Sequence, residues 1–121
     1  MITRRYLREH PDHVFVFGDN LLRKGNAGAA YLRTAPNVYG FITKKFPGRR
    51  DVDYYEPHEY VDTYKQEIVK LRFEVQRNPD KTYLISRLGS GLANKHGIFE
   101  AIIEPNIKED LEEFENVRFI W

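Results

Sequence analysis

Cysteine is absent from this sequence of 121 residues. Its absence excludes disulfides, zinc sites with thiolate ligands and a cysteine nucleophile. The four histidines give no pair with the spacing of metal ligands. We therefore predict neither a metal site nor a cofactor.

Long apolar runs are also missing. No segment approaches the length that is needed to cross a bilayer. Arg4, Arg5 and Arg8 near the N-terminus are not followed by the apolar segment of a signal peptide. We expect a cytoplasmic protein without a membrane partner.

The net charge of +1 is too small for a protein that coats nucleic acid, so nucleic acid is not expected as the main partner. The charge is unevenly spread, because Lys44-Lys45 and Arg49-Arg50 form a basic run and the stretch from Glu104 to Glu115 is acidic. A basic loop beside a neutral body suits a small anionic ligand. The sequence leaves the oligomeric state open.

Short segments rich in β-branched and aromatic residues predict four strands, at His13–Phe17, Val38–Thr43, Tyr83–Arg87 and Val117–Trp121. An apolar stripe from Val61 to Val75 predicts a long helix that Asn78-Pro79-Asp80 ends. Further helices are predicted at Asn26–Leu32 and after Pro105.

Alternating strands and helices predict crossover connections. We expect an α/β fold with three layers, α/β/α, around a mostly parallel, mixed central sheet. The length fits one domain over residues 1–121. Phe46–Pro57 lacks periodicity and is predicted to be a functional loop.

Two glycine-rich turns follow predicted strands. The first strand leads to Asp19, Asn20 and a turn at Gly25 and Gly28, and the third leads to Gly89-Ser90-Gly91. Exposed backbone N–H groups in such turns, or at a helix start, bind anions. Either turn alone is also compatible with ordinary chain reversal. Because ligands collect at the carboxyl ends of strands in α/β sheets, the pair predicts a diphosphate site.

The second strand ends in Thr43 and Lys44, which can contact phosphate, and Arg49 in the following loop can close over it. Paired basic residues also commonly serve only to solvate a surface. Neither glycine turn has the Gly-Lys-Ser/Thr ending of a phosphate loop, so an ordinary triphosphatase is not expected.

The order of these parts resembles the macro domain family, and most closely an outlying, compact macro-like group. The resemblance covers most of His13–Trp121. It rests on four motifs, which here read Phe17-Gly18-Asp19-Asn20, Asn26-Ala27-Gly28-Ala29, Thr43-Lys44 and Leu88-Gly89-Ser90-Gly91-Leu92-Ala93. The run of glycines is shorter than in the usual macro signature, and typical macro domains are longer.

This resemblance implies a macro domain-like fold that binds ADP-ribose or a related nucleotide derived from it. Some macro domains hydrolyse ADP-ribosyl bonds with an ordered water aided by an asparagine or a carboxylate, which implies Asp19 or Asn20 as catalytic residues. The implied ligand-binding residues are Gly18, Gly25, Asn26, Ala27, Gly28, Thr43, Lys44, Arg49, Gly89, Ser90, Gly91 and Leu92.

Three functions stay open at this point: a module that binds ADP-ribose or a signalling nucleotide, an ADP-ribosyl hydrolase, and an adaptor that keeps the fold without the pocket. The glycine turns and the near-neutral charge favour the first two. We expect valine in place of Gly28 or Gly89 to abolish binding without unfolding the domain.

Overall fold

The computed structural model describes residues 1–121, apart from the side chain of Ala29, which lies outside the described part although it belongs to the second motif above. The elements follow one another as α1 (Arg4–Glu9), β1 (His13–Asn20), the 3₁₀ helix η1 (Gly28–Leu32), β2 (Val38–Lys44), the 3₁₀ turn η2 (Asp51–Asp53), α2 (Pro57–Arg77), β3 (Thr82–Ile85), the π-helical η3 (Phe99–Ile103), α3 (Glu104–Leu111) and β4 (Val117–Phe119). The α/β fold is confirmed.

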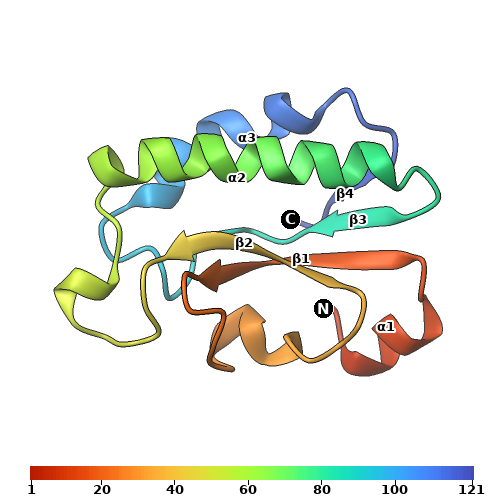
Figure 1. Ribbon diagram of the computed structural model, residues 1–121, viewed down its shortest axis with the longest axis horizontal. Coiled ribbons are helices and arrows are strands. Elements are labelled where there is room, and N and C mark those ends of the chain that lie inside the picture. The colour runs from red at the N-terminus through yellow and green to blue at the C-terminus, as the bar shows by residue number, and fades with distance from the viewer.

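The four strands form one sheet in the order β2-β1-β3-β4. All three pairings are parallel, so the parallel sheet is confirmed and the expected mixed character is not seen. Each of the four predicted strands is present. α2 and α3 cover one face of the sheet, and α1 and η1 lie on the other (Figure 1).

β1 is longer than predicted. Gly18, Asp19 and Asn20 were expected in a turn, but they continue the strand and pair with Phe41, Ile42 and Lys44 of β2. These three residue types favour turns, but here they stay extended because the parallel strand β2 supplies partners for their backbone groups. The consequence is that Asp19 and Asn20 are held on the sheet itself.

The long helix α2 packs its apolar stripe against the sheet, as predicted. Tyr64, Ile68, Leu71 and Val75 are buried in the larger of two core clusters. Pro57 occupies the first turn, where its missing N–H costs nothing. The helix ends at Arg77 and is capped by Asn78, whose N–H donates to the carbonyl of Val75.

The opposite face has a smaller core of Leu7, Phe15, Phe17, Ala30 and Leu32. Its helix α1 was not predicted, because six residues with one buried side chain give no periodic signal. The expected helix at Asn26–Leu32 is the shorter 3₁₀ helix η1.

The helix predicted after Pro105 is confirmed as α3, which has Ile107 and Leu111 buried. The π-helical η3 precedes it directly. The loop after β2 is internally bonded, because the carbonyl of Asp53 accepts from the N–H groups of both Lys45 and Phe46. None of the helices in the described residues has the length and apolar character needed to cross a membrane.

Candidate binding site

A pocket of about 500 Å³ opens at the carboxyl ends of β1, β2 and β3. β2 and β3 lie on opposite sides of β1 in the sheet. The connection from β1 therefore runs to one side, and the connection from β2 to β3 crosses back to the other. Ligands of open α/β sheets bind at such switch points, where neighbouring loops diverge and leave a crevice. The lining consists of Gly18, Asp19, Asn20, Lys24, Gly25, Ala27, Gly28, Ala30, Arg33, Thr43, Lys44, Pro47, Ser86, Arg87, Leu88, Gly89, Ser90, Gly91, Leu92 and Ala93.

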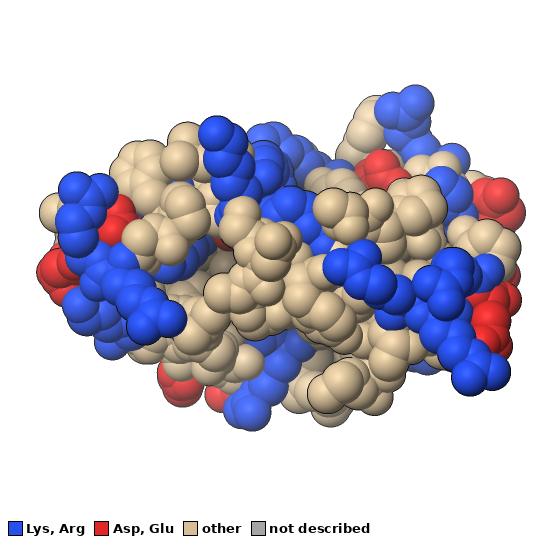
Figure 2. All heavy atoms as spheres, turned by 90° about the horizontal axis from the view of Figure 1, so that it is seen from below, with Lys and Arg blue, Asp and Glu red and all other residues tan. Residues whose placement is uncertain are grey.

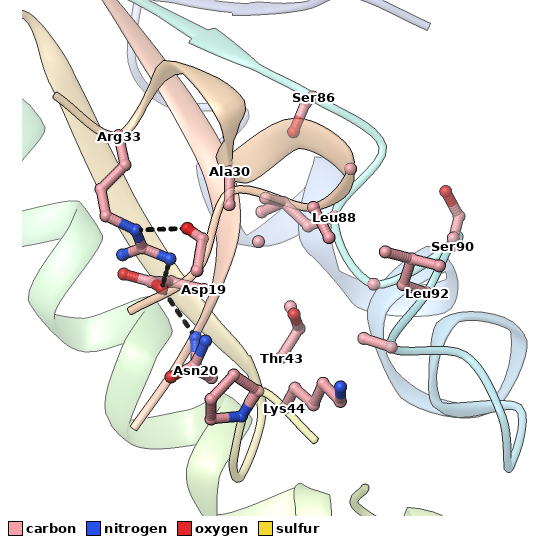
Figure 3. A pocket seen from close by; sticks show the side chains of 18 of the residues that line it. Asp19, Asn20, Ala30, Arg33, Thr43, Lys44, Ser86, Leu88, Ser90 and Leu92 are labelled. Atoms are coloured by element: carbon pink, nitrogen blue, oxygen red, sulfur yellow. Dashed lines mark hydrogen bonds and ion pairs between the residues drawn. The ribbon is translucent and has the colours of Figure 1, made fainter. Parts of the chain in front are cut away.

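The pocket brings together most of the residues singled out in the sequence. Asn26 and Arg49 are the two predicted site residues that do not line it. Asp19, Asn20 and Arg33 lie on one wall, and Leu88, Ser90 and Leu92 lie on the other (Figure 3). The two glycine turns lie close together, because even the single carbon of a Cβ at Gly28 would come within 3.4 Å of Leu92 Cδ1.

The first glycine turn offers free backbone donors. Among the described residues, the N–H groups of Gly25, Asn26 and Ala27 make no hydrogen bond to another backbone or side-chain acceptor. Gly25 has a φ of +97° and Gly28 one of +58°, which are conformations that glycine adopts without strain. The turn therefore has the unpaired donors that an anion requires.

Asn20 holds this turn in place. Its Nδ2 donates to the carbonyl of Lys24 at 2.7 Å, and its Oδ1 accepts from the N–H of Leu22 at 3.0 Å. Through these two bonds the side-chain amide of Asn20 stabilises the turn formed by residues 20–24. Its predicted contact with a ligand stays a prediction.

Asp19 is engaged in ion pairs. Its side chain is only 3% exposed, Arg33 Nη2 lies 2.7 Å from Oδ1, and Arg23 Nη1 lies 3.2 Å from Oδ2. The N–H of Asn20 also donates to Oδ1 at 2.8 Å. The carboxylate is thus compensated by two guanidinium groups, and its predicted catalytic role stays untested.

The second glycine turn presents a further set of donors. The N–H groups of Gly89, Gly91 and Leu92 make no hydrogen bond within the described residues. Ser90 Oγ donates to the carbonyl of Arg87 at 2.7 Å, which fixes the turn.

The two glycines of this turn differ in steric freedom. Gly89 has a φ of +77°, and a Cβ there would lie 2.6 Å from Ile103 Cδ1. Valine at Gly89 would therefore disturb the core, contrary to the expectation from the sequence. A Cβ at Gly91 meets nothing within 4 Å, so this position is the better probe of the site.

Thr43 and Lys44 form the floor between the two turns. Thr43 is 2% exposed, and its hydroxyl makes no hydrogen bond among the described residues. Lys44 Nζ donates to the carbonyl of Gly48 and lies 4.5 Å from the ring centroid of Tyr54. Burial lowers the pKa of Lys44, and Arg49 adds to this effect, while Asp53 opposes it.

The charge of the lining is predominantly positive. Lys24, Arg33, Lys44 and Arg87 line the pocket together with one carboxylate, that of Asp19. Figure 2 shows that Lys and Arg side chains predominate over acidic ones on the face formed by α1 and η1. A site with this balance attracts a small anion.

The loop after β2 is tied to the turn beyond the pocket. Asp51 Oδ1 lies 3.2 Å from both Lys95 Nζ and His96 Nε2. The hydrogen bond from Lys95 lowers the pKa of Asp51. Arg50 pairs with the buried Asp53 at 3.0 Å. These contacts give the loop a fixed path beside the site.

One group of residues has donors close enough for a metal, but it lies at the exposed start of α2 rather than in the pocket. The ligand atoms of Glu56, His58 and Glu59 are within 4.8 Å of one another. Glu59 already accepts from Lys45 Nζ at 2.6 Å and from the N–H of Glu56 at 3.1 Å. Glu56 and Glu59 therefore cap the helix, and Glu59 also pairs with Lys45.

Comparison with known proteins gives one match. The model of a family of unknown function, DUF7831, matches residues 1–94. The chain belongs to DUF7831. Every residue that lines the pocket falls within the matched range, whereas η3, α3 and β4 lie beyond it. The search of curated proteins gave no match, and neither did the search of solved structures.

Several pocket residues of this DUF7831 chain were missed by reasoning from the sequence, among them Arg33 and Arg87; Lys24, Ala30, Pro47 and Ser86 also line the pocket without having been predicted. Arg33 lies outside the glycine motif, and only the return of the chain after η1 brings it to Asp19. Arg87 was assigned to the end of a strand, but β3 ends at Ile85 and Arg87 belongs to the turn. Its position directly before Leu88-Gly89 was the signal available in the sequence.

Proposed function

We propose that this chain is a macro domain-like module that binds ADP-ribose or a related nucleotide derived from it. The observation that carries the proposal is the convergence of both glycine turns and of Thr43-Lys44 on one cationic pocket. These segments are distant in sequence, and each contains a motif that resembles the macro domain family. A shared pocket is what a common ligand requires.

The pocket has the chemistry of a nucleoside diphosphate site. Free N–H groups in both turns suit the diphosphate, and Lys44 and Arg87 supply positive charge. Apolar lining from Pro47, Leu88 and Leu92 suits a base or the carbon face of a ribose. The volume of about 500 Å³ falls within the range of small-molecule sites.

The alternative is an ADP-ribosyl hydrolase that acts on ADP-ribosylated targets or on a nucleotide signal. Asp19 and Asn20 line the pocket, as this alternative needs. Both side chains are occupied, the carboxylate by Arg23 and Arg33 and the amide by the backbone of residues 22–24. This engagement favours binding over hydrolysis.

The test is calorimetric titration of the whole chain with ADP-ribose. We expect binding by the unmodified protein and none detectable by Gly91→Val, because the new side chain would occupy the approach to the free N–H groups. Gly91 has open space around its Cα, so the thermal midpoint should stay unchanged. Lys44→Gln should weaken binding about tenfold, the effect of losing roughly 1.4 kcal/mol.

Lys65→Gln is the matched control, since Lys65 is exposed on α2 and does not line the pocket. No binding by the unmodified protein at millimolar ADP-ribose would refute the proposal, as would normal affinity in Gly91→Val. Release of ADP-ribose from an ADP-ribosylated protein substrate would establish the hydrolase instead.

A further inference from the structure

Arg33 connects the first glycine turn to the sheet. It follows η1, and its side chain, 17% exposed, reaches back along the chain. Its Nε donates to the carbonyl of Gly25 at 2.9 Å, and its Nη2 donates to the carbonyl of Lys24 at 3.2 Å. The same Nη2 lies 2.7 Å from Asp19 Oδ1. One planar group thus holds two carbonyls of the turn and a carboxylate of β1. Figure 3 shows Arg33 and Asp19 facing each other.

Asp19 is a rigid anchor for this contact. It is buried on β1, and its second oxygen faces Arg23, whose Nη1 also donates to the carbonyl of Gly40 at 2.8 Å. The absence of a side chain at Gly40 makes room for the group, because a Cβ there would lie 2.5 Å from Asp19 Oδ2. Arg33 is further fixed by the ring of Phe17, 5.5 Å from its Cζ.

The contacts of Arg33 set the direction of the donors in the turn. In a trans peptide the C=O of one residue and the N–H of the next point in opposite directions. When Arg33 holds the carbonyls of Lys24 and Gly25, it therefore also orients the N–H groups of Gly25 and Asn26. Neither N–H has an acceptor among the described residues. The carbonyl of Lys24 also accepts from Asn20 Nδ2, whereas within the described residues Arg33 is the one side chain that bonds the carbonyl of Gly25.

We propose that Arg33 is a positioning residue, which holds the first glycine turn in its anion-binding conformation through the buried carboxylate of Asp19. The ligand part of this inference rests on the proposed function. In this role Asp19 serves as an anchor rather than as a catalytic group. Its pairing with two arginines also removes the repulsion that a free carboxylate would exert on a phosphate.

Arg23 provides a matched control. It pairs with Asp19 as Arg33 does, but it makes no contact with the carbonyls of Lys24 or Gly25. Arg33→Gln and Arg23→Gln thus each remove one charge and one ion pair of the same carboxylate. Only Arg33→Gln removes the hydrogen bonds to the carbonyls of Lys24 and Gly25.

The first measurement is the ¹H–¹⁵N spectrum of each variant without ligand. We expect the Gly25 and Gly28 amide signals to shift or broaden in Arg33→Gln and to stay close to their original positions in Arg23→Gln. The Gly89 and Gly91 signals, from the other turn, should be unaffected in both. A change spread over all four glycines would show a general loss of structure and would contradict the proposal.

The second measurement is ADP-ribose affinity. Arg33→Gln should bind at least about tenfold more weakly than Arg23→Gln, a difference of roughly 1.4 kcal/mol. Arg33→Lys keeps the charge beside Asp19, but its single amine cannot reproduce the planar fork, so it should recover only part of the affinity that Arg33→Gln loses. If Arg33→Gln fails to fold, Arg33→Lys takes its place in both measurements.

Equal spectra and equal affinities for the Arg33 and Arg23 variants would overturn the proposal. If the unmodified protein binds no ADP-ribose, the proposed function fails, and the glycine signals still decide whether Arg33 orders the turn. The two failures are therefore distinguishable.

Discussion

Thr43 brings a hydroxyl to the floor of the pocket. Its Oγ1 lies 2.9 Å from where a Cβ of Gly18 would stand, and the N–H of Gly89 lies 3.7 Å from that same point. The hydroxyl and this N–H are both unpaired among the described residues. Both residues line the pocket, so a donor or acceptor without a partner in the chain is available there to a ligand.

Thr43→Val should weaken ADP-ribose binding about fivefold or more, because it removes the hydroxyl and keeps the shape of the side chain. The thermal midpoint should not fall, since the hydroxyl has no partner in the folded chain. Thr43→Ser keeps the hydroxyl and is the control for calorimetry. Equal affinity of the valine and serine variants would show that Thr43 only packs against Gly18.

Among the elements, β2 is an edge strand, and side chains of α2 bond its backbone groups at Ile42. The N–H of Ile42 donates to Glu67 Oε1 at 2.7 Å, and the hydroxyl of Tyr60 donates to the carbonyl of Ile42 at 2.5 Å. Both side chains come from α2 and are buried. This cover keeps another strand from pairing with this part of β2 and fixes the helix over the end of the sheet that carries the pocket.

Glu67→Ala should lower the free energy of unfolding by about 1–3 kcal/mol, because it leaves the N–H of Ile42 buried without an acceptor. Glu67→Gln should cost less, since its amide oxygen can still accept. Urea unfolding measures both. Gln66→Ala, at an exposed neighbouring position, controls for the change in helix propensity. A cost for Glu67→Ala no greater than that of Gln66→Ala would contradict this account of the edge.

In the molecule as a whole, positive and negative charges are unevenly distributed along the chain. Residues 1–55 carry ten Lys or Arg against five Asp or Glu, whereas residues 56–121 carry nine against thirteen. The basic part contains α1, η1 and the two strands that begin the pocket.

The long helix and the sheet bury several tyrosines, and burial raises the pKa values of Tyr39, Tyr60, Tyr64 and Tyr83.

Stability should therefore fall in alkali. Burial raises the pKa of Tyr39 from its ordinary value of 10.0 to about 12, with Glu67 and Glu74 adding to the shift. Above pH 10 the phenol ionises in the unfolded chain while it stays neutral in the folded one, so unfolding releases a proton. This contribution to stability is complete below pH 10 and is lost as the pH rises to about 12.

Urea midpoints measured between pH 8 and pH 12 test this expectation. Tyr39→Phe should unfold at the same urea concentration as the parent at pH 8 and should lose less stability by pH 11. The comparison with the parent removes the effect of lysine titration, which both chains share. Parallel curves for the two proteins would show that Tyr39 does not contribute.

Local patterns in the sequence were enough to predict the strands, the long helix and the two glycine turns. These patterns are β-branched runs, an apolar stripe with helical spacing, and glycines where the chain needs a positive φ. The sequence was also enough to predict that the turns meet, because parallel strands bring their carboxyl ends to one edge. Short α1, with a single buried side chain, left no such pattern.

The contacts of Asp19, Asn20 and Arg33 could not be predicted from the sequence, because they form only in the folded chain. From the sequence, the first two follow a strand and could as well touch a ligand as shape a turn, and Arg33 carries no signal. In the fold, pairing with β2 extends β1 through Asp19, and the chain returns after η1 to place Arg33 against it. The physical reason is that an ion pair depends on distances in space, which residue order alone does not fix.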